Sequence, residues 1–148
     1  GALSASESIQ IGGLRSSVGP VVVLGPGTGL GTAVIVNNGP EPQVMPSEAG
    51  HMSAAPSGDD ARIVFERSRL RHGRVSWERL LCGDGLALFD AVARGADEAA
   101  EPADVAARAQ AGDTAARHAA SAFAHALAPA PMKNRAGLSK SLLKNPSV

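Results

Sequence analysis

Four glycines stand at every second position of residues 24–31, where the sequence reads Leu-Gly-Pro-Gly-Thr-Gly-Leu-Gly. Glycine lacks a Cβ atom and adopts positive φ without a steric penalty, so such a loop can point successive backbone amides into one concavity. That arrangement suits an anion such as a phosphate group, and Thr28 adds a hydroxyl group to the turn. We therefore expect a phosphate-binding turn here.

The residues around this turn exclude two common phosphate motifs. The flanking stretches 21–24 and 32–36 are rich in β-branched residues, which favour β-strands, so the turn joins two strands. A dinucleotide fingerprint would place Gly-x-Gly-x-x-Gly at the start of a helix, and the glycine spacing does not fit. A Walker loop would end in Gly-Lys-Ser/Thr, but the first lysine of the chain is Lys133. A Gly-Thr-Gly turn within a β-hairpin remains, and a plain glycine-rich hairpin tip is the alternative.

A second candidate pair is Glu48 and His51, in the polar stretch Ser-Glu-Ala-Gly-His. An ionised glutamate accepts hydrogen bonds, and a neutral histidine donates one and accepts one, so the pair can match neighbouring hydroxyl groups of a sugar. A surface loop with two solvated side chains is the alternative. Glu78 follows Ser76 in the first turn of a predicted short helix, where exposed N–H groups stabilise a carboxylate without any function.

Four segments, taken in order and spacing, resemble the bacterial glucokinase family, ATP-dependent sugar kinases of the actin/hexokinase-like fold. The segments are residues 24–31, 46–51, 72–80 and 83–86, and the resemblance covers roughly residues 8–128. It implies transfer of the γ-phosphoryl group of ATP, with Mg²⁺, to the 6-hydroxyl of glucose. Glu48, His51 and Glu78 match the residues that bind glucose in the family. The resemblance also implies that four loop residues bind the ATP phosphates: Gly25, Gly27, Thr28 and Gly29.

The sequence departs from the family pattern in two ways. Ala49 stands where the family has glycine, and alanine would be strained by about 1 kcal/mol or more if that position needs positive φ. The family's Asn-Asp-Phe motif, whose aspartate is the catalytic base, and its upstream Asp-x-Gly-Gly-Thr loop do not occur in these 148 residues. We therefore assign no catalytic residue and expect negligible turnover. The alternatives are a non-catalytic sugar-binding fragment and an incomplete gene product without activity.

The predicted fold is a mixed α/β one, an antiparallel β-meander with helices. The resemblance assigns it to the large lobe of an actin/hexokinase-like (ribonuclease H-like) fold. The strands are expected at residues 21–24, 32–36 and 43–45, with Asn38-Gly39 as a hairpin turn. Alternation would place Val34 and Val36 on one face of the sheet and Ala33 and Ile35 on the other. The helices are expected at residues 57–72, 76–81, 86–94, 102–111 and 114–128.

Apolar spacing predicts which faces of two helices are buried. Ile63, Val64, Phe65 and Leu70 would form the apolar stripe of helix 57–72. Helix 86–94 would bury its own apolar positions, which are Leu86, Phe89 and either Val92 or Ala93.

The abrupt change in composition near the C-terminus predicts two regions. All three lysines fall within the last sixteen residues, which contain no Asp or Glu. We expect residues 1–128 to be part of a kinase large domain and residues 129–148 to be a basic, disordered tail.

Composition limits the partners. Fourteen basic and fourteen acidic side chains give zero formal net charge, which argues against a nucleic-acid or membrane-surface protein. No apolar run approaches the roughly 20 residues that cross a bilayer.

Cys82 is the single cysteine, and His118 and His125 have no third ligand nearby, so we predict neither a disulfide nor a metal site. These features favour a cytoplasmic protein, and open sheet edges favour oligomers such as a homodimer.

Overall fold

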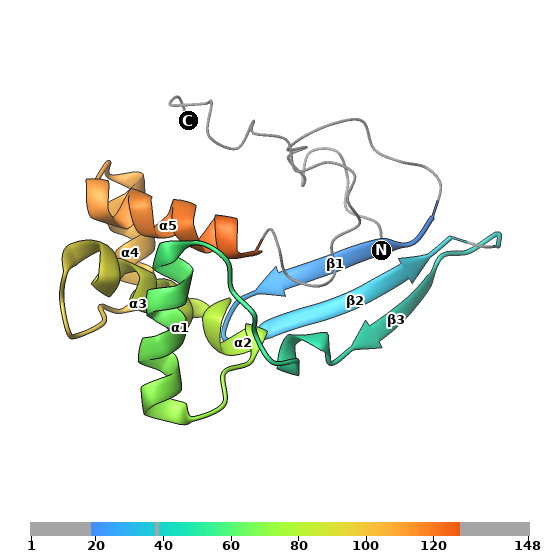
Figure 1. The fold of residues 1–148 in the computed structure, drawn as a ribbon. Coiled ribbons are helices and arrows are strands. Elements are labelled where there is room, and N and C mark those ends of the chain that lie inside the picture. Colours follow the sequence, from blue (N-terminus) through green and yellow to red (C-terminus); the bar gives the residue numbers. More distant parts are fainter. Residues whose placement is uncertain (1–18, 38, 128–148) are drawn as a thin grey trace.

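In the part of the chain that the structure describes, the sheet is a three-stranded antiparallel meander. The computed structural model describes residues 19–37 and 39–127; Asn38 and the predicted tail at 129–148 lie outside them. The strands β1 (Val21–Pro26), β2 (Leu30–Val36) and β3 (Gln43–Ser47) are arranged in the order β1-β2-β3. The outer strands contain Pro26 and Pro46. In Figure 1 the sheet projects from one side of a cluster of helices.

Five α-helices follow the sheet in the described part of the chain. They are α1 (Asp59–His72), α2 (Trp77–Leu80), α3 (Gly83–Arg94), α4 (Pro102–Gln110) and α5 (Thr114–Leu127). Gly73 ends α1 with φ of 74°, and Gly95 ends α3 in the left-handed region with φ of 63°. Asp113 caps α5, because its Oδ1 accepts a hydrogen bond of 2.7 Å from the N–H of Ala116. Sequence reasoning predicted these three boundaries.

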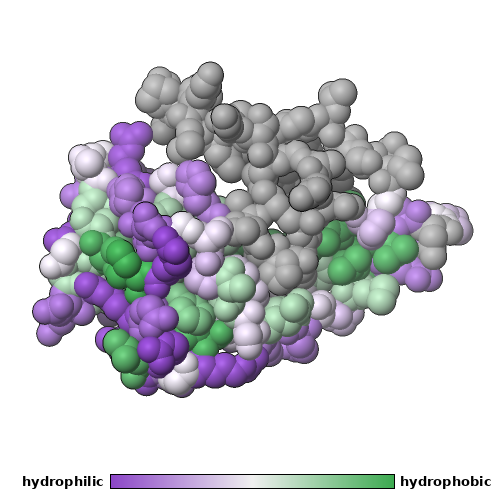
Figure 2. Space-filling model, viewed as in Figure 1, coloured by the Kyte–Doolittle hydropathy of each residue, from purple (hydrophilic) through white to green (hydrophobic). Residues whose placement is uncertain are grey.

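The hydrophobic core lies among the helices rather than under the sheet. Phe89 of α3 packs edge to face against Phe123 of α5, with ring centroids 6.0 Å apart. The largest apolar side chains with almost no exposure include Leu80, Leu81 and Val64. The space-filling view in Figure 2 shows hydrophobic surface along the sheet as well as among the helices.

Burial is even along the middle of β2, which pairs on both sides as a regular strand. Residues 33–36 are all half-buried, so neither face of this strand is a fully covered core face. Leu30 is the buried residue of β2, at 5% exposure, and it belongs to the helical core. On β3, Val44 and Met45 are exposed. The sheet is therefore attached to the core mainly through the hairpin end that carries Leu30.

Two helix predictions also need correction. In α1, Ile63 and Leu70 are exposed, and the buried face consists of Ala61, Val64 and Ser68. Of the predicted stripe, Val64 is fully buried and Phe65 packs against the core, so apolar spacing selected this face only in part.

Helix α3 begins at Gly83, three residues earlier than predicted, and Leu86 is only half-buried. A Cβ atom on Gly85 would lie 2.1 Å from the carbonyl oxygen of Leu80, so the turn between α2 and α3 closes too tightly for any side chain at this position. Gly85 is thus part of α3, and its lack of a side chain permits the close approach of α3 to the end of α2.

One buried carboxylate links α3 to α4. Asp90 has no exposed surface, its Oδ2 accepts a hydrogen bond of 2.7 Å from Arg94 Nε, and the same oxygen lies 2.6 Å from Arg108 Nη2. Burial opposes ionisation of Asp90, but the interactions with Arg108 and then Arg94 outweigh it and hold the pKa of this carboxyl below its ordinary value. This ion cluster was not recognised from the sequence.

Candidate functional site

A short stretch of backbone pairing sets the geometry of the candidate site. Residues 52–54 run antiparallel to residues 75–77: the N–H of Ala54 donates to the carbonyl of Val75 at 3.0 Å, and the N–H of Trp77 donates to the carbonyl of Met52 at 3.0 Å. Ser53 and Ser76 form the bridge between these bonds. This register brings the residue before the first segment, His51, next to the residue after the second, Glu78.

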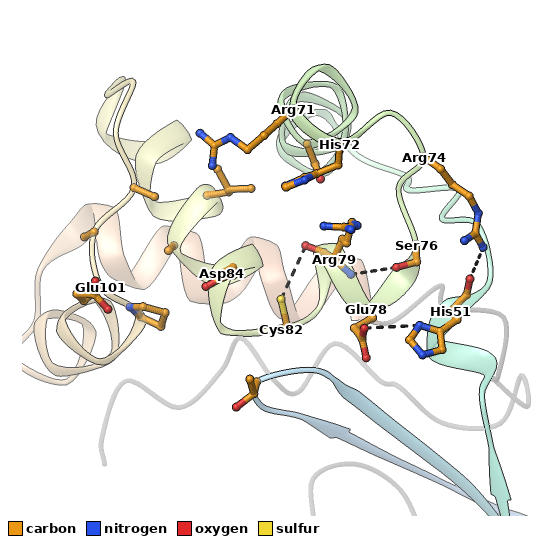
Figure 3. Close-up of a pocket in the computed structure, with 17 residues that line it drawn as sticks. His51, Arg71, His72, Arg74, Ser76, Glu78, Arg79, Cys82, Asp84 and Glu101 are labelled. Carbon is orange, nitrogen blue, oxygen red and sulfur yellow. Dashed lines mark hydrogen bonds and ion pairs between the residues drawn. The ribbon is translucent and has the colours of Figure 1, made fainter.

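The three residues predicted to bind a sugar therefore lie together. His51 Nε2 is 3.3 Å from Glu48 Oε2, and His51 Nδ1 is 3.6 Å from Glu78 Oε1. The side chain of Glu48 is 88% exposed, that of His51 59% and that of Glu78 34%, so exposure increases from Glu78 outwards. Figure 3 shows His51 and Glu78 facing each other above the end of the sheet. The arrangement offers an imidazole between two carboxylates, a set of groups able to donate to and accept from hydroxyl groups.

The turn that carries Glu48 and His51 is a short 3-10 helix, η2 (Ala49–His51). The N–H of His51 donates to the carbonyl of Glu48 at 2.9 Å. Among the described residues no non-glycine residue has positive φ, so the strain that we expected at Ala49 does not occur. The position that requires glycine is Gly50, because a Cβ atom there would lie 2.6 Å from the carbonyl oxygen of Leu30.

Arg74 also fixes this turn, and sequence reasoning missed it. Its guanidinium donates to the carbonyl of His51 and, at 3.3 Å through Nε, to Ser53 Oγ. The abundance of arginine between residues 62 and 74 was the available signal, but a solvated helix face explained that abundance equally well. Arg74 thus holds the backbone beside the imidazole.

The predicted phosphate turn is the tip of the β1–β2 hairpin. Gly25 pairs with Gly31 inside the sheet, and Gly27, Thr28 and Gly29 form the loop. We expected these glycines to be present because they can adopt positive φ. That expectation was wrong, since none of the described positive-φ glycines belongs to this stretch. At Gly29 the reason is close packing: a Cβ atom there would lie 2.6 Å from Glu78 Oε2.

Some of the backbone amides of this turn are already used. The N–H of Gly27 donates to the carbonyl of Gly29 at 2.8 Å, and the N–H of Leu30 donates to Glu78 Oε2 at 3.2 Å. The carbonyl of Gly27 accepts a bond of 2.8 Å from the N–H of Gly83, which docks the turn on the start of α3. Within residues 19–37 and 39–127, the amides of Thr28 and Gly29 have no hydrogen-bond acceptor.

A cavity of about 640 Å³ joins the turn to His51 and Glu78, whereas Glu48 lies outside its lining. Its lining includes Thr28, His51 and Glu78, and it extends to the loop before α4. Further charged groups line it, none of which we predicted as site residues, and they are shown in Figure 3: Arg71, Arg74, Arg79, Asp84 and Glu101. The cavity is therefore open, polar and of mixed charge, with room for a small polar ligand.

The described part of the chain holds neither a cluster of metal ligands nor a helix that could span a membrane. No group of three or more His, Cys, Asp or Glu side chains there is placed to hold a metal ion. His118 lies 3.0 Å from Asp60 instead. No helix among these residues combines the length and the apolar character needed to cross a membrane.

Solved kinase structures share this arrangement of helices and strands. A glucokinase from an Antarctic psychrotroph matches with a TM-score of 0.66 and 26% identity, covering 84% of this chain and 41% of that one. A glucokinase from Balamuthia mandrillaris, solved in complex with glucose, matches with a TM-score of 0.56 and 23% identity, covering 72% and 33%. At 23% identity, the second match shows similarity of fold alone. The predicted fold class, part of an actin/hexokinase-like fold, is confirmed.

The class of protein that these neighbours define is a kinase. This chain belongs to the glucokinase family, because the family model described as Glucokinase matches residues 1–132. A curated relative, the glucokinase of Helicobacter pylori (strain P12), is 39% identical over 90 residues, which is 60% of this chain and 27% of that protein. The chain thus spans about a quarter of the length of this relative.

Proposed function

We propose that this chain supplies the glucose-binding side chains and part of the phosphate-binding loop of an ATP-dependent glucose kinase. One observation carries the proposal: Glu48, His51 and Glu78 converge beside the tip of the glycine-rich hairpin. Membership of the glucokinase family supports it, as does the glucose present in the structure of the Balamuthia mandrillaris relative. In the complete reaction the 6-hydroxyl of glucose would receive the γ-phosphoryl group of ATP.

Each residue has a distinct part in this proposal. The two carboxylates accept hydrogen bonds from sugar hydroxyl groups, and the ring nitrogens of His51 bind neighbouring hydroxyls. The Thr28 hydroxyl and the amides of Thr28 and Gly29 receive a phosphate of ATP. In phosphoryl transfer such positioning and electrostatic contacts supply most of the catalysis.

Two parts of the reaction are not assigned to residues of this chain. No three His, Cys, Asp or Glu side chains among the described residues are placed to hold a metal ion, and we assign no Mg²⁺ ligand to this chain. The Asn-Asp-Phe motif that carries the family's catalytic base is not present in the 148 residues. General-base assistance contributes about 10²–10⁴-fold to such reactions, so we expect binding of glucose with negligible turnover.

Glucose titration by calorimetry tests the proposal. The chain should bind glucose, and Glu48→Ala, His51→Ala and Glu78→Ala should each weaken binding, by about tenfold or more for the carboxylates. Glu66→Ala is the matched control, because this carboxylate pairs with Arg69 on the exposed surface of α1 and does not line the cavity. Equal affinities of all four variants and the parent chain would overturn the assignment of the site.

A coupled ATP and glucose assay separates the remaining possibilities. Binding without turnover supports a sugar-binding part of the enzyme, and measurable turnover would mean that another residue serves as the base. Neither binding nor turnover would favour an incomplete product without activity. A cytoplasmic location and a homodimer stay predictions, and light scattering of the purified chain tests the second.

A further inference from the structure

The two carboxylate oxygens of Glu78 contact different halves of the site. Oε2 accepts the backbone N–H of Leu30 at 3.2 Å, across 48 residues of sequence. Oε1 lies 3.6 Å from His51 Nδ1. One side chain therefore contacts both the hairpin tip and the cluster proposed to bind the sugar.

The main chain that carries Glu78 is well fixed. The residue lies in the first turn of α2, where Ser76 Oγ accepts the N–H of Arg79 at 3.4 Å and Trp77 and Leu80 are buried. The hairpin tip is docked at two points, at Leu30 by Glu78 and at Gly27 by the N–H of Gly83. Loss of the Glu78 contact would leave the tip held by the second bond and by the burial of Leu30.

The fit between Gly29 and Glu78 leaves no room for a methyl group. A Cβ atom on Gly29 would lie 2.6 Å from Oε2 and 3.2 Å from Cδ of Glu78. Since the carboxylate is the end of a flexible side chain, it would move away if this atom were added. Gly27 differs, because a Cβ atom there would meet nothing within 4 Å. Glycine at position 29 is thus required for the contact between the hairpin tip and Glu78.

We propose that Glu78 is a positioning residue for the phosphate turn, and that it couples sugar binding to the placement of that turn. This rests on the proposed function. A sugar hydroxyl that donates to Glu78 holds the carboxylate in the orientation that also accepts the N–H of Leu30, so bound glucose makes the turn more rigid. By reciprocity, an ordered turn favours glucose.

Amide hydrogen exchange measured residue by residue by NMR tests the positioning role without any ligand. In Glu78→Ala the amide of Leu30 should exchange about tenfold faster or more, because its charged acceptor is gone. The amide of Trp77 should keep its protection, since its acceptor is the carbonyl of Met52. Unchanged exchange at Leu30 in this variant would overturn the proposal.

Gly29→Ala provides a second variant that keeps the glutamate, in case Glu78→Ala does not fold. It should accelerate exchange at Leu30, whereas Gly27→Ala, which adds the same methyl group to the same turn, should leave the Leu30 amide unchanged. Equal effects of the two alanines would contradict the role of Glu78.

Addition of glucose then tests the coupling. Saturating glucose should slow exchange at Leu30 in the parent chain several-fold and should have no effect there in Glu78→Ala. Glucose that binds without changing Leu30 exchange would overturn the coupling. Another outcome is that glucose does not bind while Glu78→Ala and Gly29→Ala still accelerate exchange of the Leu30 amide. In that case the proposed function fails and the positioning role of Glu78 stands.

Discussion

Asp90 Oδ2 lies 2.6 Å from Arg108 Nη2, and this ion pair joins α3 to α4 at a carboxylate with no exposed surface. The second oxygen of Asp90 has no hydrogen-bond partner among the described residues. The cluster therefore depends on the arginines that reach Oδ2. Both arginine side chains are about one third exposed, so water still reaches them.

Asp90→Ala should destabilise the protein by about 3 kcal/mol, near the lower end of the range for breaking a buried ion pair. The physical reason is that two arginines lose their shared partner and a cavity forms between α3 and α4. Urea unfolding followed by circular dichroism measures the change. Glu66→Ala, which breaks an exposed pair, should cost less than about 1 kcal/mol. Similar losses in the two variants would contradict this account.

Stability should depend on pH through Asp90. Its pKa in the folded protein lies below the ordinary value of 3.8, so the folded state favours the ionised carboxylate. The resulting stabilisation is complete above the unfolded pKa and is lost as pH falls through the lower folded pKa. Unfolding measured near neutral pH and at about pH 3 should show a smaller loss in Asp90→Asn than in the parent chain. An identical loss would mean that other carboxylates cause the acid sensitivity.

Gly50→Ala should destabilise the protein by about 1–3 kcal/mol. The added methyl group would lie 2.6 Å from the carbonyl oxygen of Leu30, and backbone cannot move aside as a side chain can. Gly39→Ala is the control, since a Cβ atom there meets nothing within 4 Å. Urea midpoints compare the two, and equal midpoints would show that η2 and β2 separate easily.

The N-terminus of α5 offers a further test. Asp113→Ala removes the acceptor of the Ala116 N–H and should cost about 1 kcal/mol, whereas Asp113→Asn keeps an oxygen at that position and should cost less. Thermal unfolding of both variants measures the difference. If Asn is as damaging as Ala, the carboxylate matters through Arg108, 3.6 Å away, rather than as a cap.

Local chemistry explains which parts of the fold could be predicted. The ends of α1, α3 and α5 follow from Gly73, Gly95 and Asp113, whose preferences act within one turn of helix. The strands follow from β-branched runs. The buried face of α1 was predicted only in part: Val64 is buried as expected, whereas Ile63 and Leu70 have helical spacing yet are exposed.

The site was predictable only in part for the same reason. Glu48, His51 and Glu78 were selected because they match a family pattern, and spacing alone left each explicable without function. The contact between Glu78 and Leu30 spans 48 residues, so no local pattern could indicate it. The glycines of the turn were expected for their φ angles, but at Gly29 it is the proximity of a carboxylate that excludes a side chain.

The prolines of the two outer strands limit how the sheet can grow. Proline has no N–H group, so Pro26 and Pro46 offer no donor, only a carbonyl acceptor, to a strand that adds to either edge. Both prolines lie at the hairpin-tip half of the sheet, where they pair with Leu30 and Ala33. Addition of a further strand is therefore favoured at the opposite half, along residues 21–23 and 43–45, where every backbone N–H is present.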